Sequence, residues 1–229
     1  ATLSLPPAAS QRPSAELEIT FAPLAWLKLL HFLHADDVEV GGFGISDADA
    51  LLRIGSFESV TQTVSLAHVE LDDLAVADHF DRCIDQNIPP HRCGRIWIHT
   101  HPGNCPHPSS TDERMFKRVF GHCDWAAMVI IARDGSTYAR INFTSGAHPH
   151  TGHGLVGHVI VPVQVDWARL PEDLLQHEGE LDHLISGWSD EYGRNIHPEL
   201  WPSFSDTNLP NPPDPTAPTS TTNPRRPRR

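Results

Sequence analysis

Apolar residues recur along the chain with two periods, which predict an alternation of helices and strands. Spacings of three and four residues predict helices over four segments: 21–34, 71–88, 112–121 and 171–188. Short runs rich in β-branched and aromatic residues predict strands within five segments: 38–45, 51–66, 94–98, 125–132 and 136–143. Helices and strands mixed in this order indicate one α/β domain over residues 16–201.

The same periods predict which helix faces are buried and where elements end. The first helix is expected to bury Leu27, Leu30 and Leu33 or His34. The second helix is expected to bury one row of side chains: Leu74, Ala77, Phe80 or Asp81, Ile84 and Ile88. Gly121 is predicted to end the third helix, Pro171 to begin the last one, and Asp134-Gly135 to form a hairpin turn.

The two ends of the chain differ from this pattern. Residues 1–15 are rich in Pro, Ala and Ser and are expected to form a flexible arm. Residues 202–229 are rich in Pro, Thr and Arg and hold too few apolar residues for a core, which predicts a disordered tail. The final "RRPRR" either contacts a polyanion or is simply solvated, and the solvated tail is the preferred interpretation.

Charge and composition narrow the function classes. The formal net charge is -12, and it lies near -16 without the four Arg of "RRPRR", which argues against a nucleic-acid-binding surface. No apolar run approaches the roughly 18–20 residues of a membrane helix, and no secretory signal is visible, so a cytoplasmic protein is expected. The cysteines lack C-x-x-C spacing and are interpreted as free thiols: Cys83, Cys93, Cys105 and Cys123.

The segment "WIHTHPGNCPHPSSTDE", residues 97–113, concentrates potential metal ligands where a strand runs into a helix. Alternate residues of a strand share a face, so His99 and His101 point the same way and Thr100 points opposite. Two such imidazoles are a ready pair of zinc ligands. The spacing by itself favours two partly exposed histidines at the end of a strand.

Asp112 follows eleven residues after His101, beyond a loop stiffened by prolines. One register makes Ser110 the N-cap with Glu113 in a capping box, which leaves Ser109 and Asp112 for another task. The other register makes Ser109 the cap and Asp112 its partner, leaving nothing for a metal. The first register is the one we expect.

Two His and one Asp are the ligand count of a catalytic zinc, which keeps a fourth position for water. A fourth ligand from Cys105 or His107 would instead make the site structural. Hydrolysis by a zinc-bound water also needs a base that accepts the proton of that water. Glu39 is a candidate for this base, and it is expected on a strand beside Gly41 and Gly42. Taken alone, Glu39 is better interpreted as a surface strand residue, and its candidacy as the base depends on the resemblance that follows.

The string Glu39 … His99-Thr100-His101-x7-Ser109-x-x-Asp112 resembles the motif of the JAMM (MPN-plus) zinc metalloproteases. Each defined position of that motif is present, and the resemblance covers about residues 22–143. It implies an MPN-like domain with a mixed, mostly antiparallel curved sheet flanked by helices.

The resemblance also implies roles for five residues. His99, His101 and Asp112 would bind one Zn²⁺ per chain, and Glu39 would hold and deprotonate the metal-bound water. Ser109 would hydrogen-bond the oxyanion of the tetrahedral intermediate.

By the same resemblance, the expected activity is zinc-dependent cleavage after the C-terminal tail of a ubiquitin-like protein, as deconjugation or precursor processing, with E1- or E2-like proteins as possible partners. The alternatives are processing of a sulfur-carrier protein and a non-catalytic MPN scaffold module. A scaffold module typically lacks some of the ligands, and all of them are present here.

A second histidine-rich segment, "SGAHPHTGHGLVGH", carries His148, His150, His153 and His158 among glycines. It fits a second metal site or a flexible loop, and the loop is preferred because no Cys or carboxylate is interleaved. In the fold that the resemblance implies, this loop borders the substrate groove.

Overall fold

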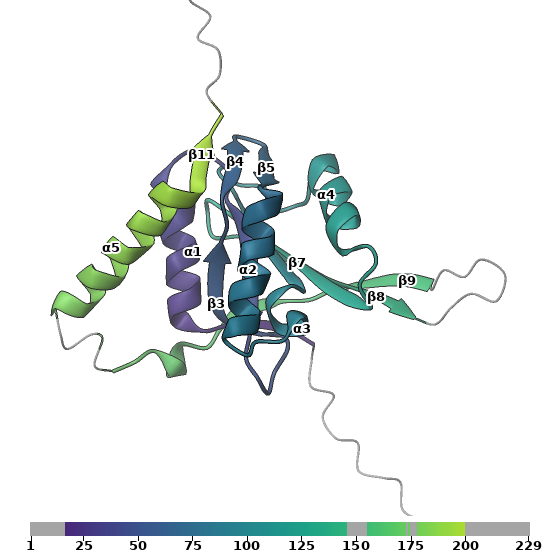
Figure 1. The fold of residues 1–229 in the computed structure, drawn as a ribbon, viewed down its shortest axis with the longest axis horizontal. Coiled ribbons are helices and arrows are strands. Elements are labelled where there is room, and N and C mark those ends of the chain that lie inside the picture. The colour runs from purple at the N-terminus through teal and green to yellow at the C-terminus, as the bar shows by residue number, and fades with distance from the viewer. Residues whose placement is uncertain (1–16, 146–154, 173, 175–177, 200–229) are drawn as a thin grey trace, which may run out of the picture. The chain divides into compact units, whose positions relative to one another are not determined.

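The computed structural model describes residues 17–145, 155–172, 174 and 178–199, and Figure 1 shows their arrangement. The predictions for residues 1–15 and 202–229, and for His148, His150 and His153, lie outside these residues. The helices are α1 (Pro23–Ala35), α2 (Asp73–Asp85), α3 (Pro90–Cys93), α4 (Ser110–Phe120), the 3-10 turn η1 (Trp167–Arg169) and α5 (Glu178–Asn195). The strands are β1 (Ile19–Phe21), β2 (Gly41–Ser46), β3 (Arg53–Ser59), β4 (Gln62–Ser65), β5 (His68–Leu71), β6 (Ile96–His101), β7 (Trp125–Ala132), β8 (Thr137–Ser145), β9 (Leu155–Ile160), β10 (Val163–Val165) and β11 (Ile196–Pro198).

The main sheet is mixed, as predicted. In the described part of the chain it has eight strands in the order β10-β1-β3-β2-β6-β7-β8-β9. At its centre β6 runs antiparallel to β2 and parallel to β7. Four of its seven pairings are antiparallel, so the predicted excess of antiparallel strands is correct by a narrow margin. A smaller sheet joins β11, β4 and β5.

The helices cover two faces of the main sheet. Apolar side chains of α1 pack on one face, against residues such as Ile96 and Ile98 of β6, and α5 packs outside α1. On the other face, Phe116 and Phe120 of α4 pack on Trp97 of β6 and on strands β2 and β7, with α2 beside them. Alternate residues of β6 therefore face α1 or α4, and this alternation places His99 and His101 on the α4 side.

The predicted buried face of α1 is only partly correct. Leu33 is buried, but Leu27 and Leu30 are half-buried and line a groove against α5. Lys28 is buried instead, because its Nζ donates to the carbonyl of Phe57 at 2.7 Å and pairs with Glu191 of α5 at 2.7 Å. An ion pair between two helices thus replaces the apolar contact that the spacing predicts.

The predicted buried face of α2 is wrong. Leu74 is 77% exposed and Ile84 59% exposed, whereas His79 and Cys83 are buried. His79 stacks on the ring of Phe43 with 4.6 Å between centroids. The helix is turned so that His79 and Cys83 face the sheet. The spacing of apolar residues along the helix does not predict this orientation.

The last helix also differs from its prediction. Pro171 lies before α5, which spans Glu178–Asn195. The other boundaries are confirmed: α4 ends before Gly121, β7 is a buried strand, and Gly135 has φ 83 in the turn before β8. Among the described residues, no helix is both long and apolar enough to cross a membrane.

Candidate metal centre

The end of β6 brings the two predicted histidines together on the α4 face of the sheet. His99 is 0% exposed and its ring stacks on Trp97 with 4.2 Å between centroids. Thr100 points the other way, and its hydroxyl oxygen accepts from the Val40 N–H at 3.0 Å. The backbone of Thr100 also donates to the Val40 carbonyl at 2.9 Å, which ties β6 to the chain just before β2.

Asp112 reaches the same place from the first turn of α4, although the expected capping register is wrong. Ser109 is the N-cap: its Oγ accepts from the Asp112 N–H at 3.2 Å, and its own N–H donates to Asp112 Oδ2 at 2.6 Å. A carboxylate has two oxygens with several lone pairs, so capping leaves Asp112 free to face the histidines as well. Glu113, the expected box partner, instead accepts from both terminal nitrogens of Arg140 on β8, at 2.6 and 2.7 Å.

The spacing of these three side chains fits an ion between them. His99 Nε2 lies 3.4 Å from Asp112 Oδ1, and His101 Nε2 lies 3.6 Å from Asp112 Oδ2. These separations are long for hydrogen bonds. Two ligands bound at about 2.0–2.1 Å to a tetrahedral zinc ion lie about 3.3–3.4 Å apart, which is close to the observed values.

Buried polar atoms without partners mark the same point. Both ring nitrogens of His99, Nε2 of His101 and Oε2 of Glu39 are buried without a hydrogen bond within the described chain. A buried polar group without a partner costs about 1–3 kcal/mol, so unpartnered atoms on three neighbouring side chains are expensive unless something else binds there. His101 Nδ1 lies 2.7 Å from the carbonyl of Cys105. Donation to that carbonyl leaves the lone pair of Nε2 facing Asp112, as in metal-bound histidines.

Glu39 lies beside the histidines, in the segment just before β2. It precedes β2 rather than lying on it, and its N–H donates to the carbonyl of Ser65 at 2.9 Å. Because Gly41 pairs with His99, the antiparallel register places Glu39 across from His101. Glu39 is 5% exposed, and its Oε1 lies 3.7 Å from His101 Nε2. The reading of Glu39 as a surface residue is therefore wrong.

The glycines after Glu39 permit this close packing of strands. A Cβ on Gly42 would lie 2.4 Å from the carbonyl oxygen of Glu58 on β3. The expectation that another backbone comes close here is confirmed.

Burial and mutual contact shift the pKa values in the metal-free cluster. Burial raises the pKa of Glu39 to about 8, with His101 opposing and Asp112 adding to the rise. Burial lowers the pKa of His99. Burial would also lower the pKa of His101, but Asp112, the Cys105 carbonyl and Glu39 outweigh it and raise that pKa. Burial works against ionisation of Asp112, yet both histidines and the Ser109 N–H hold its pKa well below the usual range.

The two candidate fourth ligands do not join the cluster. The group of described residues able to hold a metal here is His99, His101 and Asp112, whose ligand atoms lie within 4.8 Å of one another. Cys105 is exposed and contributes its carbonyl, and the ring of His107 packs edge-on against Tyr138. If these three residues bound a tetrahedral ion, a fourth position would be left for a non-protein ligand.

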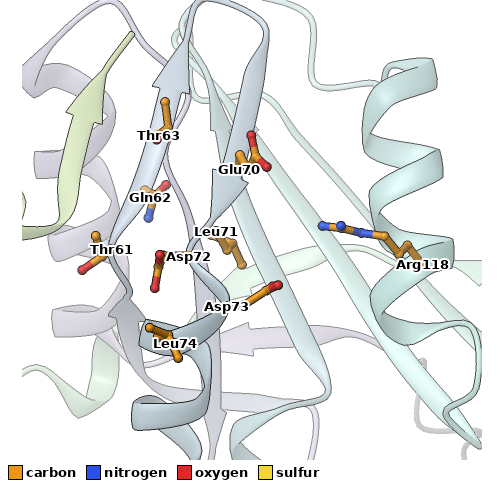
Figure 2. A pocket seen from close by; sticks show the side chains of 9 residues that line it. All are labelled: Thr61, Gln62, Thr63, Glu70, Leu71, Asp72, Asp73, Leu74 and Arg118. Carbon is orange, nitrogen blue, oxygen red and sulfur yellow. The ribbon is translucent and has the colours of Figure 1, made fainter.

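A polar pocket of about 480 Å³ lies between the β4–β5 hairpin, the start of α2 and α4. It is close to the group formed by His99, His101 and Asp112. Figure 2 shows Arg118 extending from α4 towards Glu70 and Leu71 of β5. Gln62 forms the wall towards the cluster: its amide accepts from the Gly41 N–H and donates to the Gly41 carbonyl, both at 2.7 Å. Gly41 is the residue paired with His99, so a single strand separates the pocket from the histidines.

The supporting role of Gln62 is absent from the sequence prediction. The side-chain amide of Gln62 bonds the backbone of Gly41 as a neighbouring strand would. Such a glutamine has no periodic or motif signal in the sequence, because only the fold brings it to Gly41. Strand alternation correctly predicts that Thr100 points to the face opposite His99 and His101, but its hydrogen bond with the Val40 N–H is visible only in the fold.

Neither a comparison with models of known protein families nor a search of curated protein sequences finds a match for this chain. The architecture is a mixed α/β fold, and the site consists of two buried histidines, a buried aspartate and a neighbouring buried glutamate.

Proposed function

We propose that the chain is a zinc-dependent hydrolase that cleaves a peptide or isopeptide bond. One observation carries the proposal: unpaired nitrogens of His99 and His101 and an oxygen of Asp112 meet at one buried point with Glu39 beside it. A structural zinc usually takes four protein ligands, whereas three with an adjacent carboxylate are typical of hydrolytic sites. A zinc ion bound here would act as a Lewis acid and lower the pKa of a water molecule.

The protein residues around this point suit the remaining tasks of hydrolysis. Glu39 has one oxygen facing His101 and one without a partner, so it can accept a proton from water and pass it to the leaving amine. The hydroxyl of Ser109 accepts from the Asp112 N–H, which leaves its own hydrogen to donate to an oxyanion. Since the N–H of Ser109 is held by Asp112, the donor is fixed relative to the ligand.

The substrate class is inferred from the resemblance to JAMM metalloproteases: the tail of a ubiquitin-like protein, processed or deconjugated, with E1- or E2-like proteins as partners. Two features support a polypeptide substrate. β5 is the last strand of its sheet, with no partner on its outer edge in the described chain, so an extended segment can add to it. The pocket of Figure 2 gives such a segment room beside the site.

The proposal is tested with the zinc-loaded full chain and fusions in which a ubiquitin-like domain carries a C-terminal extension. The wild type is expected to release the extension, and Glu39→Gln to keep zinc but turn over about 10²–10⁴-fold more slowly, as for loss of a general base. Undiminished turnover in Glu39→Gln would remove Glu39 from the mechanism.

Two other functions are separated by the same assay. Release of extensions from sulfur-carrier proteins alone would favour the sulfur-carrier alternative. Zinc bound without cleavage of either class would favour the non-catalytic scaffold, which the complete ligand set argues against.

A further inference from the structure

A second cluster of metal-binding side chains lies where α2, α3 and β2 meet. His79 and Cys83 occupy the inner face of α2, one turn apart, and Cys93 is the last residue of α3. Their exposed fractions are 2%, 5% and 0%. We propose that these three residues bind a second zinc ion, which ties α2 to α3.

The spacing of the three ligand atoms supports this assignment. His79 Nε2, Cys83 Sγ and Cys93 Sγ form a group within 4.8 Å of one another, and the first two are 3.8 Å apart. A nitrogen at about 2.0–2.1 Å and a sulfur at about 2.3 Å from a tetrahedral zinc ion lie about 3.6 Å apart. The i, i+4 spacing on a helix is what brings the first two ligands together.

The backbone that carries the third ligand is fixed independently of any metal. Arg92 donates from Nε and Nη2 to the carbonyl of Ser46 at the end of β2, at 2.9 and 2.7 Å. The Gly94 N–H closes α3 on the carbonyl of Pro90 at 2.9 Å. Cys93 is thus held against α2 and needs little movement to bind an ion.

The surroundings favour zinc over a hard cation and offer a fourth ligand position. Ile45, Phe80 and Ile88 pack around the two thiols, and two sulfurs with an imidazole suit Zn²⁺ rather than Mg²⁺ or Ca²⁺. A small cavity of about 90 Å³ adjoins the cluster, with His79, Cys83 and Glu58 in its lining. It has room for a water molecule as fourth ligand, and the Glu58 carboxylate borders the same space.

Protons on the ligand atoms must leave them when zinc binds. His79 Nε2 lies 3.0 Å from the carbonyl of Cys93, as a donor, and burial together with Cys83 raises the pKa of Cys93 to about 12. Zinc binding forms two Zn–S bonds and one Zn–N bond, releases the two thiol protons to solvent, and moves the His79 proton from Nε2 to Nδ1. No electrons are transferred. This site shares no ligand with the one beside Glu39, so it can be tested independently of the hydrolase proposal.

Cobalt titration of the reduced, metal-free full chain tests the second site. Thiolate ligands give sulfur-to-cobalt charge-transfer absorption in the near ultraviolet, whereas a site of two histidines and an aspartate gives none. We expect this absorption in the wild type, saturation at one equivalent in His101→Ala, which lacks the other site, and no absorption in Cys83→Ser. Cys123→Ser is the matched control, because Cys123 lies in neither cluster, and it should leave the absorption unchanged.

Two results would overturn the assignment. The first is a wild-type chain with all four thiols reduced and no charge-transfer absorption at cobalt saturation, a reading that needs no variant to fold. The second is a Cys83–Cys93 disulfide in the protein as purified under reducing conditions, since the same two sulfurs would then serve a covalent bond.

Discussion

Glu39→Gln should stabilise the metal-free protein, and by an amount that depends on pH. Glu39 is 5% exposed and has one oxygen without a partner, and burial raises its pKa from the ordinary 4.5 to about 8. At about 1.4 kcal/mol for each pKa unit, ionising this carboxyl costs on the order of 5 kcal/mol more in the folded chain than in the unfolded chain. Glutamine has nearly the same shape and no charge, so it removes that cost.

The direction of the pH dependence follows from the raised pKa. Between pH 4.5 and about 8 the folded chain binds more protons at Glu39 than the unfolded chain does, so its free energy of unfolding falls as pH rises through this window. Glu39→Gln should therefore match the wild type near pH 4.5 and exceed it by a few kcal/mol above pH 8. The measurement is urea unfolding with a chelator present at both pH values.

Glu70→Gln is the matched control, since it makes the same substitution at a side chain that is 67% exposed. A Glu39→Gln variant with the same stability difference at both pH values would refute the reasoning. It would mean that the carboxylate is solvated or has a charged partner, and that Glu39 is not a desolvated base beside the site.

Substitutions at three further residues test the proposed metal site. His101→Ala should lose zinc and activity, and with them the zinc-linked gain in unfolding free energy, about 2.7 kcal/mol at zinc concentrations 100-fold above Kd; thermal melts with and without zinc measure this. Asp112→Asn keeps an oxygen for the Ser109 N–H but loses the charge, so its zinc affinity should fall by at least about tenfold while circular dichroism stays unchanged. Ser109→Ala should cost about 1 kcal/mol of stability and roughly 10²-fold in kcat, and Ser109→Asn should restore the cap but not kcat. Equal kcat in wild type, Ser109→Ala and Ser109→Asn would limit Ser109 to capping.

The sequence predicts the candidate site better than it predicts the helix faces. Strand alternation correctly places His99 and His101 on one side, because the period of a strand is fixed by its backbone. The proline-containing loop after His101 and the helix start that follows it predict that Asp112 lies close to His99 and His101, and this prediction is correct. Local geometry is sufficient for these inferences, and the wrong capping register does not alter them.

The helix faces require information that local patterns lack. α2 buries His79 and Cys83 and exposes Leu74, since partners on β2 and α3 decide which face turns inward. α1 buries Lys28 because Glu191, more than 150 residues away along the chain, supplies a countercharge. Long-range pairing of this kind is not encoded in any window of residues around the helix.

Anomalous diffraction at the zinc absorption edge, from crystals of the zinc-loaded full chain, tests the metal centre most directly. We predict a peak in contact with Nε2 of His99, Nε2 of His101 and a carboxylate oxygen of Asp112, with Glu39 beside the remaining position. A map without a peak at that point, or with the Cys105 thiolate bound to the ion as a fourth protein ligand, would contradict the account.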